Sequence, residues 1–415
     1  MFNARHLVSR LRAFTQRGPR SPSPPRPLST VNPSIINSNI PIEEERLPWY
    51  DSRDFYPVRV GQVFKSRYQV VGKLGYGGYS TVWLCRDLME HCYVAVKVFS
   101  QLSTEPIQRE LEAFRYLNNL AKTDDFGRQC IRTPLDQFEL PVDPAISSQP
   151  FQCLVFEPAA KSIWDVREKA RGDLLPENVV KAVVRHVLFA LVYLHQEAKM
   201  VHTDIQEQNI LLSMMDFEAL RAYEDSERTN PLPQKVVGNR NIYLSRAIDC
   251  EAYGHPVLSD FGEARFGRAK YTGAIQPIPY RAPEVILGMP WDEKVDIWSL
   301  GTMIWDMFQG TRLFETAAGP DSRQHIAHMV SLLGLPPADF LRRSETGEPW
   351  KYFDTRGHWT GTTTLSNDSL ELLEHRLEGE KKAQFLGFVR KMLKWIPEER
   401  YTAYELLDDP WLSSS

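Results

Sequence analysis

The sequence predicts an α+β fold of two unequal lobes: a small, strand-rich lobe with one main helix, then a larger, mainly helical lobe, with a cleft between them. Between residues 67 and 99, apolar and polar residues alternate along three short runs around a cluster of glycines, and a period of two indicates half-buried strands. From residue 176 onward, apolar residues recur with helical spacing instead. At 415 residues with 42% hydrophobic residues, the chain can bury one large core or two lobes.

Each predicted element has its own local signal. Residues 67–87 predict two strands joined by a flexible hairpin, and residues 93–99, YVAVKVF, predict a third strand. Residues 103–120 carry apolar side chains on one helical face, and residues 151–158, FQCLVFEP, predict a buried strand that ends at a proline. Residues 176–196 predict a helix with a proline in its first turn and a continuous apolar stripe.

The bulk properties argue against several classes of protein. A formal net charge of −4 and a pI near 6.2 oppose a broad basic footprint, so we expect no direct nucleic-acid partner. The five cysteines show no paired spacing, which argues against a disulfide framework or a zinc cluster and fits a reducing compartment. No uninterrupted apolar run approaches the roughly 18 residues that cross a bilayer, so we expect no membrane span.

The first 42 residues differ in composition from the rest of the chain. They contain no Asp or Glu, six arginines and the proline run SPSPPRP. A mitochondrial presequence and a disordered basic tail both fit this composition, and the choice between a mitochondrial and another intracellular location stays open. We therefore assign residues 1–46 to a tail and residues 47–67 to an N-terminal extension.

A glycine cluster and a strand lysine predict a phosphate-binding site. In LGYGGYSTV, Gly75, Gly77 and Gly78 would let the backbone approach phosphates closely, although a plain hairpin turn would explain the glycines alone equally well. Ser80 stands where a third glycine is usual in such loops. Lys97, in the VAVKV strand that follows at the expected interval, is placed to neutralise the α and β phosphates of a nucleotide.

Three further side chains complete a phosphoryl-transfer set. In VHTDIQEQNILL, residues 201–212, Asp204 would accept or orient the proton of a substrate hydroxyl, and Asn209 would bind a metal ion. In LSDFGEAR, Asp260 would bind the Mg²⁺ that bridges the phosphates of ATP. Glu110, on the predicted helix after the lysine strand, is the candidate to hold Lys97 in place.

The ordered motifs identify a resemblance to the eukaryotic protein kinases, from about residue 68 to residue 412. YRAPE, DIWSLG and WIPEERYTAYELLDDPWL follow the catalytic motifs in the family's order. The resemblance implies a kinase domain with an N-lobe at 68–157 and a C-lobe at 160–412. It also implies that Glu284 and Arg400 form an ion pair that ties down the activation segment, and that Asp296 braces the catalytic loop.

Within the kinases, the sequence resembles the SR-protein kinases and their fungal relatives. This likeness rests on residues 56–84, on the threonine of HTD, on the VFE strand end and on IAHMVSLLGLPP. It implies a serine/threonine kinase whose protein substrates contain Arg/Ser-rich segments. That family's spacer is long, whereas the corresponding insert here, residues 213–256, is modest and polar, and we interpret it as a solvated loop.

The resemblance also assigns the nucleotide pocket. It implies that Phe156 is the gatekeeper, that the Glu157 carbonyl and the Ala159 N–H pair with adenine, and that Val82 and Ala95 line the pocket. Pro158 lies between the two adenine-binding residues and has no N–H, which the pairing does not require. We expect a monomer that uses ATP and Mg²⁺.

Two departures from the family pattern affect the predicted activity. Thr203 replaces an arginine that in many kinases binds a phosphorylated residue of the activation segment, so we expect activity without loop phosphorylation. Gln206 replaces a lysine that contacts the transferred phosphate; it keeps an N–H donor but lacks the charge. We predict an active kinase, with a catalytically weak pseudokinase that acts as a nucleotide-binding scaffold as the alternative.

Overall fold

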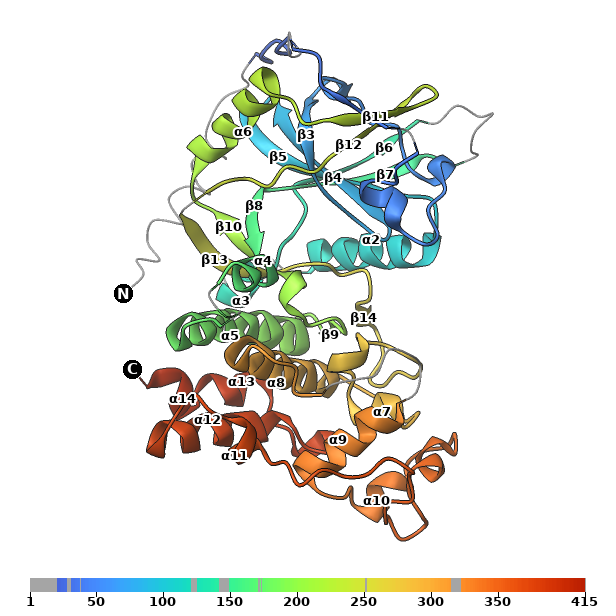
Figure 1. Ribbon diagram of the computed structural model, residues 1–415, viewed down its shortest axis with the longest axis vertical. Coiled ribbons are helices and arrows are strands. Elements are labelled where there is room, and N and C mark those ends of the chain that lie inside the picture. Colours follow the sequence, from blue (N-terminus) through green and yellow to red (C-terminus); the bar gives the residue numbers. More distant parts are fainter. Residues whose placement is uncertain are drawn as a thin grey trace. The chain divides into compact units, whose positions relative to one another are not determined.

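The computed structural model describes residues 21–27, 31–37, 39–120, 125–141, 149–170, 172, 174–250, 252–314 and 322–414 (Figure 1). The chain divides into two compact units. Unit 1 comprises residues 1–103, 134–158 and 216–251, and unit 2 comprises residues 104–133, 159–215 and 252–415. Of the predicted tail, residues 1–46, the structure describes 21–27, 31–37 and 39–46, and the other residues lie outside the described part of the chain.

Unit 1 is built on a six-stranded sheet with the order β2-β3-β4-β5-β7-β6, in which all neighbouring strands are antiparallel. Its strands are β2 (Val63–Phe64), β3 (Tyr68–Gly77), β4 (Ser80–Asp87), β5 (Cys92–Phe99), β6 (Asp136–Leu140) and β7 (Phe151–Phe156). The predicted strand hairpin, lysine strand and buried strand are thereby confirmed. Two short 3₁₀ helices, η1 (Glu43–Arg46) and η2 (Ser52–Asp54), precede the sheet.

The alternation of side chains along these strands gives the sheet two different faces. On one face lie Val82, Ala95 and Lys97, because Val82 is paired directly with Lys97, and Ala95 is two residues away on the same strand. The opposite face carries a buried apolar cluster that includes Trp83, Val96 and aromatic side chains from β6 and β7. The sheet therefore needs a cover on the face opposite Lys97.

That cover comes partly from the insert, so the prediction of a solvated loop at residues 213–256 is wrong. The insert forms helix α6 (Phe217–Thr229) and a hairpin of β11 (Gln234–Val237) and β12 (Arg240–Tyr243), and Figure 1 shows this hairpin running beside the unit 1 sheet. Strand β1 (Ile35–Ile36) of the N-terminal segment pairs with β11. Sequence reasoning took the polar composition as the main signal and missed the helical spacing of the four buried α6 residues, Ala219, Leu220, Tyr223 and Glu224.

Unit 2 is mainly helical, as predicted. Its longer helices are α2 (Thr104–Asn119), α5 (Glu177–Val192), α8 (Lys294–Gln309), α9 (Arg323–Leu333) and α12 (Gly379–Met392). Its short helices are α3 (Phe126–Gln129), α4 (Ile163–Glu168), α7 (Pro283–Ile286), α10 (Ala338–Leu341), α11 (Leu370–Leu373), α13 (Ala403–Leu407) and α14 (Pro410–Ser413). Single turns are η4 (Tyr193–Glu197), η5 (Glu207–Asn209), η6 (Ile278–Tyr280), η7 (Glu348–Lys351) and η8 (Pro397–Glu399).

The strands of unit 2 are short and carry the predicted catalytic motifs. A three-stranded sheet has the order β13-β10-β8, and a two-stranded sheet pairs β14 with β9. Their bounds are β8 (Ala159–Ser162), β9 (Met200–Val201), β10 (Ile210–Met214), β13 (Tyr253–Leu258) and β14 (Arg265–Phe266). The segment between β9 and β10 is the predicted catalytic loop.

Helices α5 and α8 form the core of unit 2. Every residue of α8 from Val295 to Phe308 is buried, and α5 packs against α3, α8 and α13. By length and composition, the continuous helix Glu177–Glu197 is apolar enough to cross a membrane, but 56% of its apolar window is buried inside the protein. Burial of this extent is also what a core helix shows.

Candidate active site

The catalytic loop places two amide side chains on the carboxylate of Asp204. Gln206 Nε2 donates to Asp204 Oδ1 at 2.7 Å, and Asn209 Nδ2 donates to Asp204 Oδ2 at 2.6 Å. Asn209 Nδ2 also lies 2.9 Å from the Asp204 carbonyl oxygen. The carboxylate of Asp204 is therefore held in one orientation by residues of its own loop.

Burial and the groups around Asp204 shift the pKa of its carboxyl group in both directions. Burial raises the pKa of its carboxyl group, the nearby carboxylate of Asp260 raises it further, and His202 and the two amide donors lower it. The net result is a pKa above the ordinary range for aspartate. A carboxylate with a raised pKa is a stronger proton acceptor than an exposed aspartate, as a general base requires.

Asp296, on α8, binds the backbone of the catalytic loop. The Asp296 carboxylate accepts hydrogen bonds from His202 N at 2.8 Å and from Thr203 N at 2.7 Å, and His195 Nε2 lies 2.9 Å from it. Thr203 has a φ of 66°, a left-handed conformation that is uncommon for a β-branched residue. The two backbone contacts with Asp296 therefore stabilise a strained loop.

The Thr203 side chain connects the catalytic loop to the residues after the DFG triplet. Its Oγ1 donates to the Glu263 carbonyl oxygen at 2.6 Å, and the whole residue is buried. Ser259 provides a second connection, because its N and Oγ donate to the Asn209 carbonyl oxygen at 2.8 and 2.9 Å. Asn209 and the segment that carries Asp260 are thus held together by neutral hydrogen bonds.

Unit 2 also brings Glu110 to the DFG segment. Glu110 is buried on α2, and a Cβ added to Gly262 would lie 3.9 Å from Glu110 Oε2 and 3.2 Å from Asp260 Oδ1. Asp260 itself adopts a φ of 67°. In the same region the ring centroids of Phe114 and Phe261 are 5.3 Å apart, so α2 packs on the DFG phenylalanine.

The chemistry of Asn209 and Asp260 fits a magnesium site. Carboxylate and amide oxygens are ligands that Mg²⁺ accepts, and this ion usually takes only one or two protein carboxylates, with its other positions filled by phosphates and water. Because Asn209 Nδ2 is engaged by Asp204, the amide oxygen is the atom that can face a metal. Among the described residues, no group of three His, Cys, Asp or Glu side chains could hold a metal by itself.

Most of the residues predicted to bind nucleotide lie on four strands of the unit 1 sheet, β3, β4, β5 and β7, or in the turn that follows β3. Gly75 and Gly77 are in β3, Gly78 is in the turn that follows, and a Cβ added to Gly75 or Gly77 would meet no atom within 4 Å. Phe156 is paired with Ala95, so both share the face of Lys97. Open space beside the glycines is what close approach of a phosphate needs.

The remaining predicted residues divide between the two units. Glu157 is the penultimate residue of its unit 1 segment, whereas Ala159 begins the next segment of unit 2. Lys97 belongs to unit 1 and Glu110 to unit 2, and the pairing of these two side chains stays a prediction.

An ion pair between Glu284 and Arg400 fixes the end of the activation segment to the rest of unit 2. Arg400 Nη1 and Nη2 donate to the two carboxylate oxygens of Glu284 at 2.6 Å each, and both residues are 1% exposed. The guanidinium also donates to the carbonyl oxygens of Lys394 and Lys294 at 3.0 Å and lies 5.0 Å from the ring centroid of Trp298. The pair that the resemblance implied is present in unit 2.

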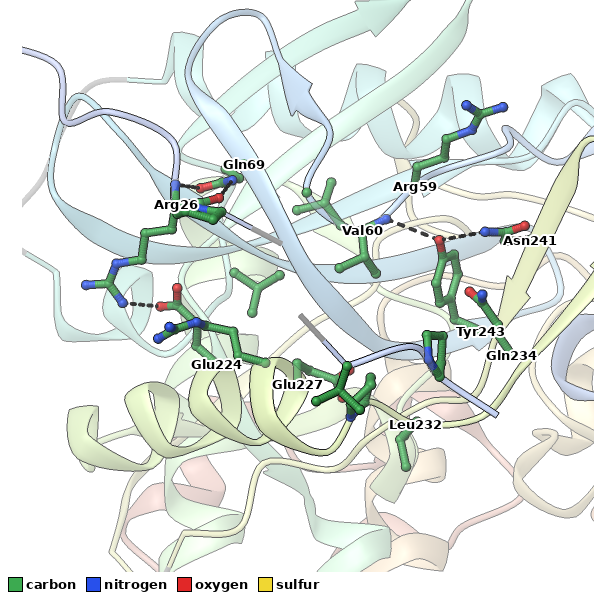
Figure 2. Close-up of a pocket in the computed structure, with 18 of the residues that line it drawn as sticks. Arg26, Arg59, Val60, Gln69, Glu224, Glu227, Leu232, Gln234, Asn241 and Tyr243 are labelled. Atoms are coloured by element: carbon green, nitrogen blue, oxygen red, sulfur yellow. Dashed lines mark hydrogen bonds and ion pairs between the residues drawn. The ribbon is translucent and has the colours of Figure 1, made fainter. Parts of the chain in front are cut away.

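A cavity of about 350 Å³ in unit 1 lies away from these residues. Figure 2 shows it between the N-terminal segment, β3, α6 and the β11–β12 hairpin, with Arg26 reaching Glu224 and the Tyr243 hydroxyl accepting from Val60 N and Asn241 Nδ2. Its described lining contains none of the residues predicted to bind nucleotide or to act in catalysis.

Sequence reasoning missed some residues that shape the catalytic loop. His195 reaches Asp296 from the end of the α5 region, and Glu263 offers its backbone carbonyl to Thr203. Neither contact has a local signal, because each joins segments about 60 to 100 residues apart.

Comparison with known proteins identifies the family of this chain. The family model described as "Protein kinase domain" matches residues 68–412. A serine/threonine protein kinase of Aspergillus fumigatus is 43% identical over 95% of this chain and 96% of its own length. Serine/threonine-protein kinase SRPK of Physarum polycephalum is 28% identical over 89% and 92%, and SRSF protein kinase 3 of Homo sapiens is 25% identical over 95% of each chain.

These matches confirm the predicted fold class and the predicted activity. The relatives are named as serine/threonine or SRSF protein kinases, and none of these findings supports the pseudokinase alternative. The chain therefore belongs to the protein kinase family and is a serine/threonine kinase, with fungal kinases and the SRPK and SRSF kinases among its relatives.

Proposed function

We propose that this kinase transfers the γ-phosphate of Mg-ATP to serines in Arg/Ser-rich protein segments. The observation that carries the catalytic part is that two amide groups donate hydrogen bonds to the partly buried Asp204 carboxylate, which lies near Asp260. The substrate class is supported by the relatives named SRPK and SRSF protein kinase.

Each predicted site residue then has a defined task. Asp204 accepts the hydroxyl proton of the substrate serine, and Gln206 and Asn209 orient its carboxylate. Asn209 and Asp260 hold Mg²⁺, which supplies neutralising charge for the phosphates when bound. Lys97 contacts the α and β phosphates and Glu110 orients Lys97. Gly75, Gly77 and Gly78 cover the phosphates, while Val82, Ala95, Phe156, Glu157 and Ala159 hold the adenine.

A peptide panel tests the substrate class. Peptides that alternate arginine and serine are compared with peptides in which every arginine is lysine, at equal length, charge and ionic strength. We expect a clear preference for arginine, because the planar guanidinium donates several hydrogen bonds in a fixed geometry and lysine does not. Equal kcat/KM for the two series would remove the arginine requirement without affecting the assignment as a kinase.

Replacing Gln206 with alanine is expected to slow phosphoryl transfer. The amide donates to the Asp204 carboxylate at 2.7 Å, and a hydrogen bond to a charged group contributes about 1.5 to 3 kcal/mol, which corresponds to a roughly 10- to 150-fold slower reaction. Because this donor lowers the pKa of Asp204, its loss raises that pKa, and the acid limb of the pH–rate profile moves to higher pH.

The matched control for this prediction is Gln208→Ala. Gln208 is an exposed glutamine of the same loop, and its side chain makes no described hydrogen bond with Asp204. Steady-state rates between pH 5 and 9 provide both readouts. A Gln206→Ala enzyme with wild-type rate and an unmoved acid limb would show that the amide does not act on the base.

Phosphatase treatment is expected to leave the activity unchanged. Thr203 stands where many kinases have a phosphate-binding arginine, and its hydroxyl is already engaged by the Glu263 carbonyl. Gln276 ties the end of the activation segment to α8 through Val295 O at 2.9 Å and Ser299 Oγ at 2.7 Å, without a phosphate. The measurement compares rates before and after treatment, with removal of phosphate verified by mass spectrometry. Loss of activity on dephosphorylation contradicts the expectation.

We further propose that the enzyme acts as a monomer inside the cell. The relatives named SRPK and SRSF protein kinase favour cytoplasm or nucleus, and a mitochondrial location remains open if residues 1–30 are a presequence. Imaging of the full chain with a C-terminal fluorescent reporter distinguishes the two.

A further inference from the structure

Strands β3 and β4, joined at Gly77–Ser80, form a hairpin that contains Gly75, Gly77 and Gly78 and is called here the glycine hairpin. Lys73, on β3, is a buried cation near these glycines. Its side chain is 0% exposed, although it lies only two residues before Gly75. The Lys73 ammonium is paired with the carboxylate of Glu44, lies 3.5 Å from Glu43 Oε2 and donates to the Tyr243 carbonyl oxygen at 3.2 Å. A buried charge of this kind is tolerated only when it is paired and hydrogen-bonded.

The partners of Lys73 come from two parts of the chain outside the sheet. Glu43 and Glu44 belong to the 3₁₀ helix η1, at the end of the segment assigned to the tail, and Tyr243 ends strand β12 of the insert. The Lys73 carbonyl oxygen is also bound by the insert: it accepts from Tyr223 OH and from Arg246 N, at 2.9 Å each. Both the side chain and the backbone of Lys73 are thereby immobilised.

The insert also anchors the acidic helix η1 itself. Lys235 Nζ, on β11, donates to both carboxylate oxygens of Glu45 at 2.8 Å and to the Ile40 carbonyl oxygen at 3.0 Å. Ser245 N donates to Glu43 Oε1 at 3.0 Å. Helix η1 is therefore held between the insert and the sheet, so it forms a fixed support.

The residues that follow η1 reach the tip of the glycine hairpin through Trp49. The indole Nε1 lies 3.5 Å from the Gly78 carbonyl oxygen, and a Cβ added to Gly78 would be 3.7 Å from Trp49 Cζ2. Trp49 is 52% exposed, so its indole contacts the hairpin at the protein surface rather than in a core. One short segment thus contacts the hairpin at its base, through Glu44, and at its tip, through Trp49.

We propose that residues 43–49, the hairpin brace, set the position of the glycine hairpin over the nucleotide phosphates, with Glu44 and Trp49 as positioning residues. This inference rests on the proposed role of Gly75, Gly77 and Gly78 in binding ATP. Without the brace, the hairpin populates more conformations. Nucleotide binding would then have to order the hairpin, and the free-energy cost of this ordering lowers the affinity for Mg-ATP. The brace does not touch the reacting atoms, so the chemical step itself is unaffected.

The decisive variant is Trp49→Ala in the full chain, because this half-exposed side chain can be removed without opening the core. We expect KM for Mg-ATP and the directly measured Kd for Mg-ATP to rise roughly five-fold, the scale of one lost hydrogen bond, with kcat within about two-fold of wild type. Trp350→Ala, which removes a 40% exposed tryptophan of unit 2, is the matched control and should change neither constant.

Two further measurements separate positioning from a general loss of structure. Hydrogen exchange should accelerate at residues 74–79 in Trp49→Ala while the melting temperature stays at the wild-type value. Glu44→Gln should raise the same Kd from the other end of the brace. If Glu44→Gln fails to fold, Trp49→Ala still decides the question.

The outcomes are distinguishable. An unchanged Kd and KM in Trp49→Ala, an equal rise in Trp350→Ala, or a fall in kcat at constant KM each overturns the brace. A wild-type protein that binds Mg-ATP but ignores Arg/Ser peptides, with Kd raised by Trp49→Ala, overturns the proposed substrate and leaves the brace standing.

Discussion

Replacing Asp204 with asparagine is expected to nearly abolish phosphoryl transfer while leaving the fold intact. A positioned general base contributes about 10²- to 10⁴-fold to the rate, and asparagine has nearly the same shape but cannot accept a proton. The loop should keep its conformation, because Asp296 holds the backbone of His202 and Thr203 independently of residue 204. The measurement is γ-phosphate transfer from labelled ATP to an Arg/Ser peptide.

The control for this experiment is Asp339→Asn, which alters a 93% exposed carboxylate in the same unit and should retain full activity. Binding of Mg-ATP by Asp204→Asn should persist, since Asn209 and Asp260 are untouched. Transfer at a wild-type rate by Asp204→Asn would remove the carboxylate from the mechanism.

The raised pKa of Asp204 sets the pH dependence of the wild-type enzyme. Transfer needs the ionised carboxylate, so activity is present above this pKa and is lost as the pH falls through it. Burial raises the pKa of the Asp204 carboxyl group and so moves this loss to a higher pH than an exposed aspartate would give, whereas Mg²⁺ held by Asp260 would oppose that shift.

Replacing Arg400 with methionine is expected to destabilise unit 2 strongly. The guanidinium donates to both Glu284 oxygens and to two backbone carbonyls, and the residue is 1% exposed. Removing one partner of a buried ion pair leaves an uncompensated charge and costs about 3 to 5 kcal/mol. Urea unfolding followed by tryptophan fluorescence measures the change in the free energy of unfolding.

The stability of Arg400→Met should be compared with that of the double variant Glu284→Leu/Arg400→Met. It removes both charges, and replacing a whole buried pair with apolar residues is far less costly than breaking it. We therefore expect the double variant to recover part of the stability that Arg400→Met loses. A loss below about 1 kcal/mol in the single variant would place this pair among ordinary surface ion pairs.

Much of the candidate site could be predicted from local spacing. The separation of Asp204 from Asn209 and the DFG order place three functional side chains on two loops, and the structure joins these loops through Ser259 and Asn209. Lys97 was predicted from its interval after the glycines, and in the structure it lies on β5, paired with Val82 of β4. These predictions rest on geometry within a few residues, which local sequence determines.

The direction of the Gln206 side chain could not be predicted in this way. Sequence reasoning treated its amide as a donor to the transferred phosphate, whereas in the structure the amide donates to Asp204. Either acceptor is compatible with the spacing, and only the folded loop shows which oxygen lies within 2.7 Å.

The amino-acid sequence by itself determined the fold class, the kinase family and the identity of the residues that can act on a phosphate, because these depend on residue type and on short periodicities. The tertiary structure alone decided which carbonyl oxygen accepts from Thr203 Oγ1, and that the insert and helix η1 enclose Lys73. Burial and charge pairing between distant segments make these choices, since an ammonium or carboxylate enters a protein interior only where a partner from elsewhere in the chain compensates it.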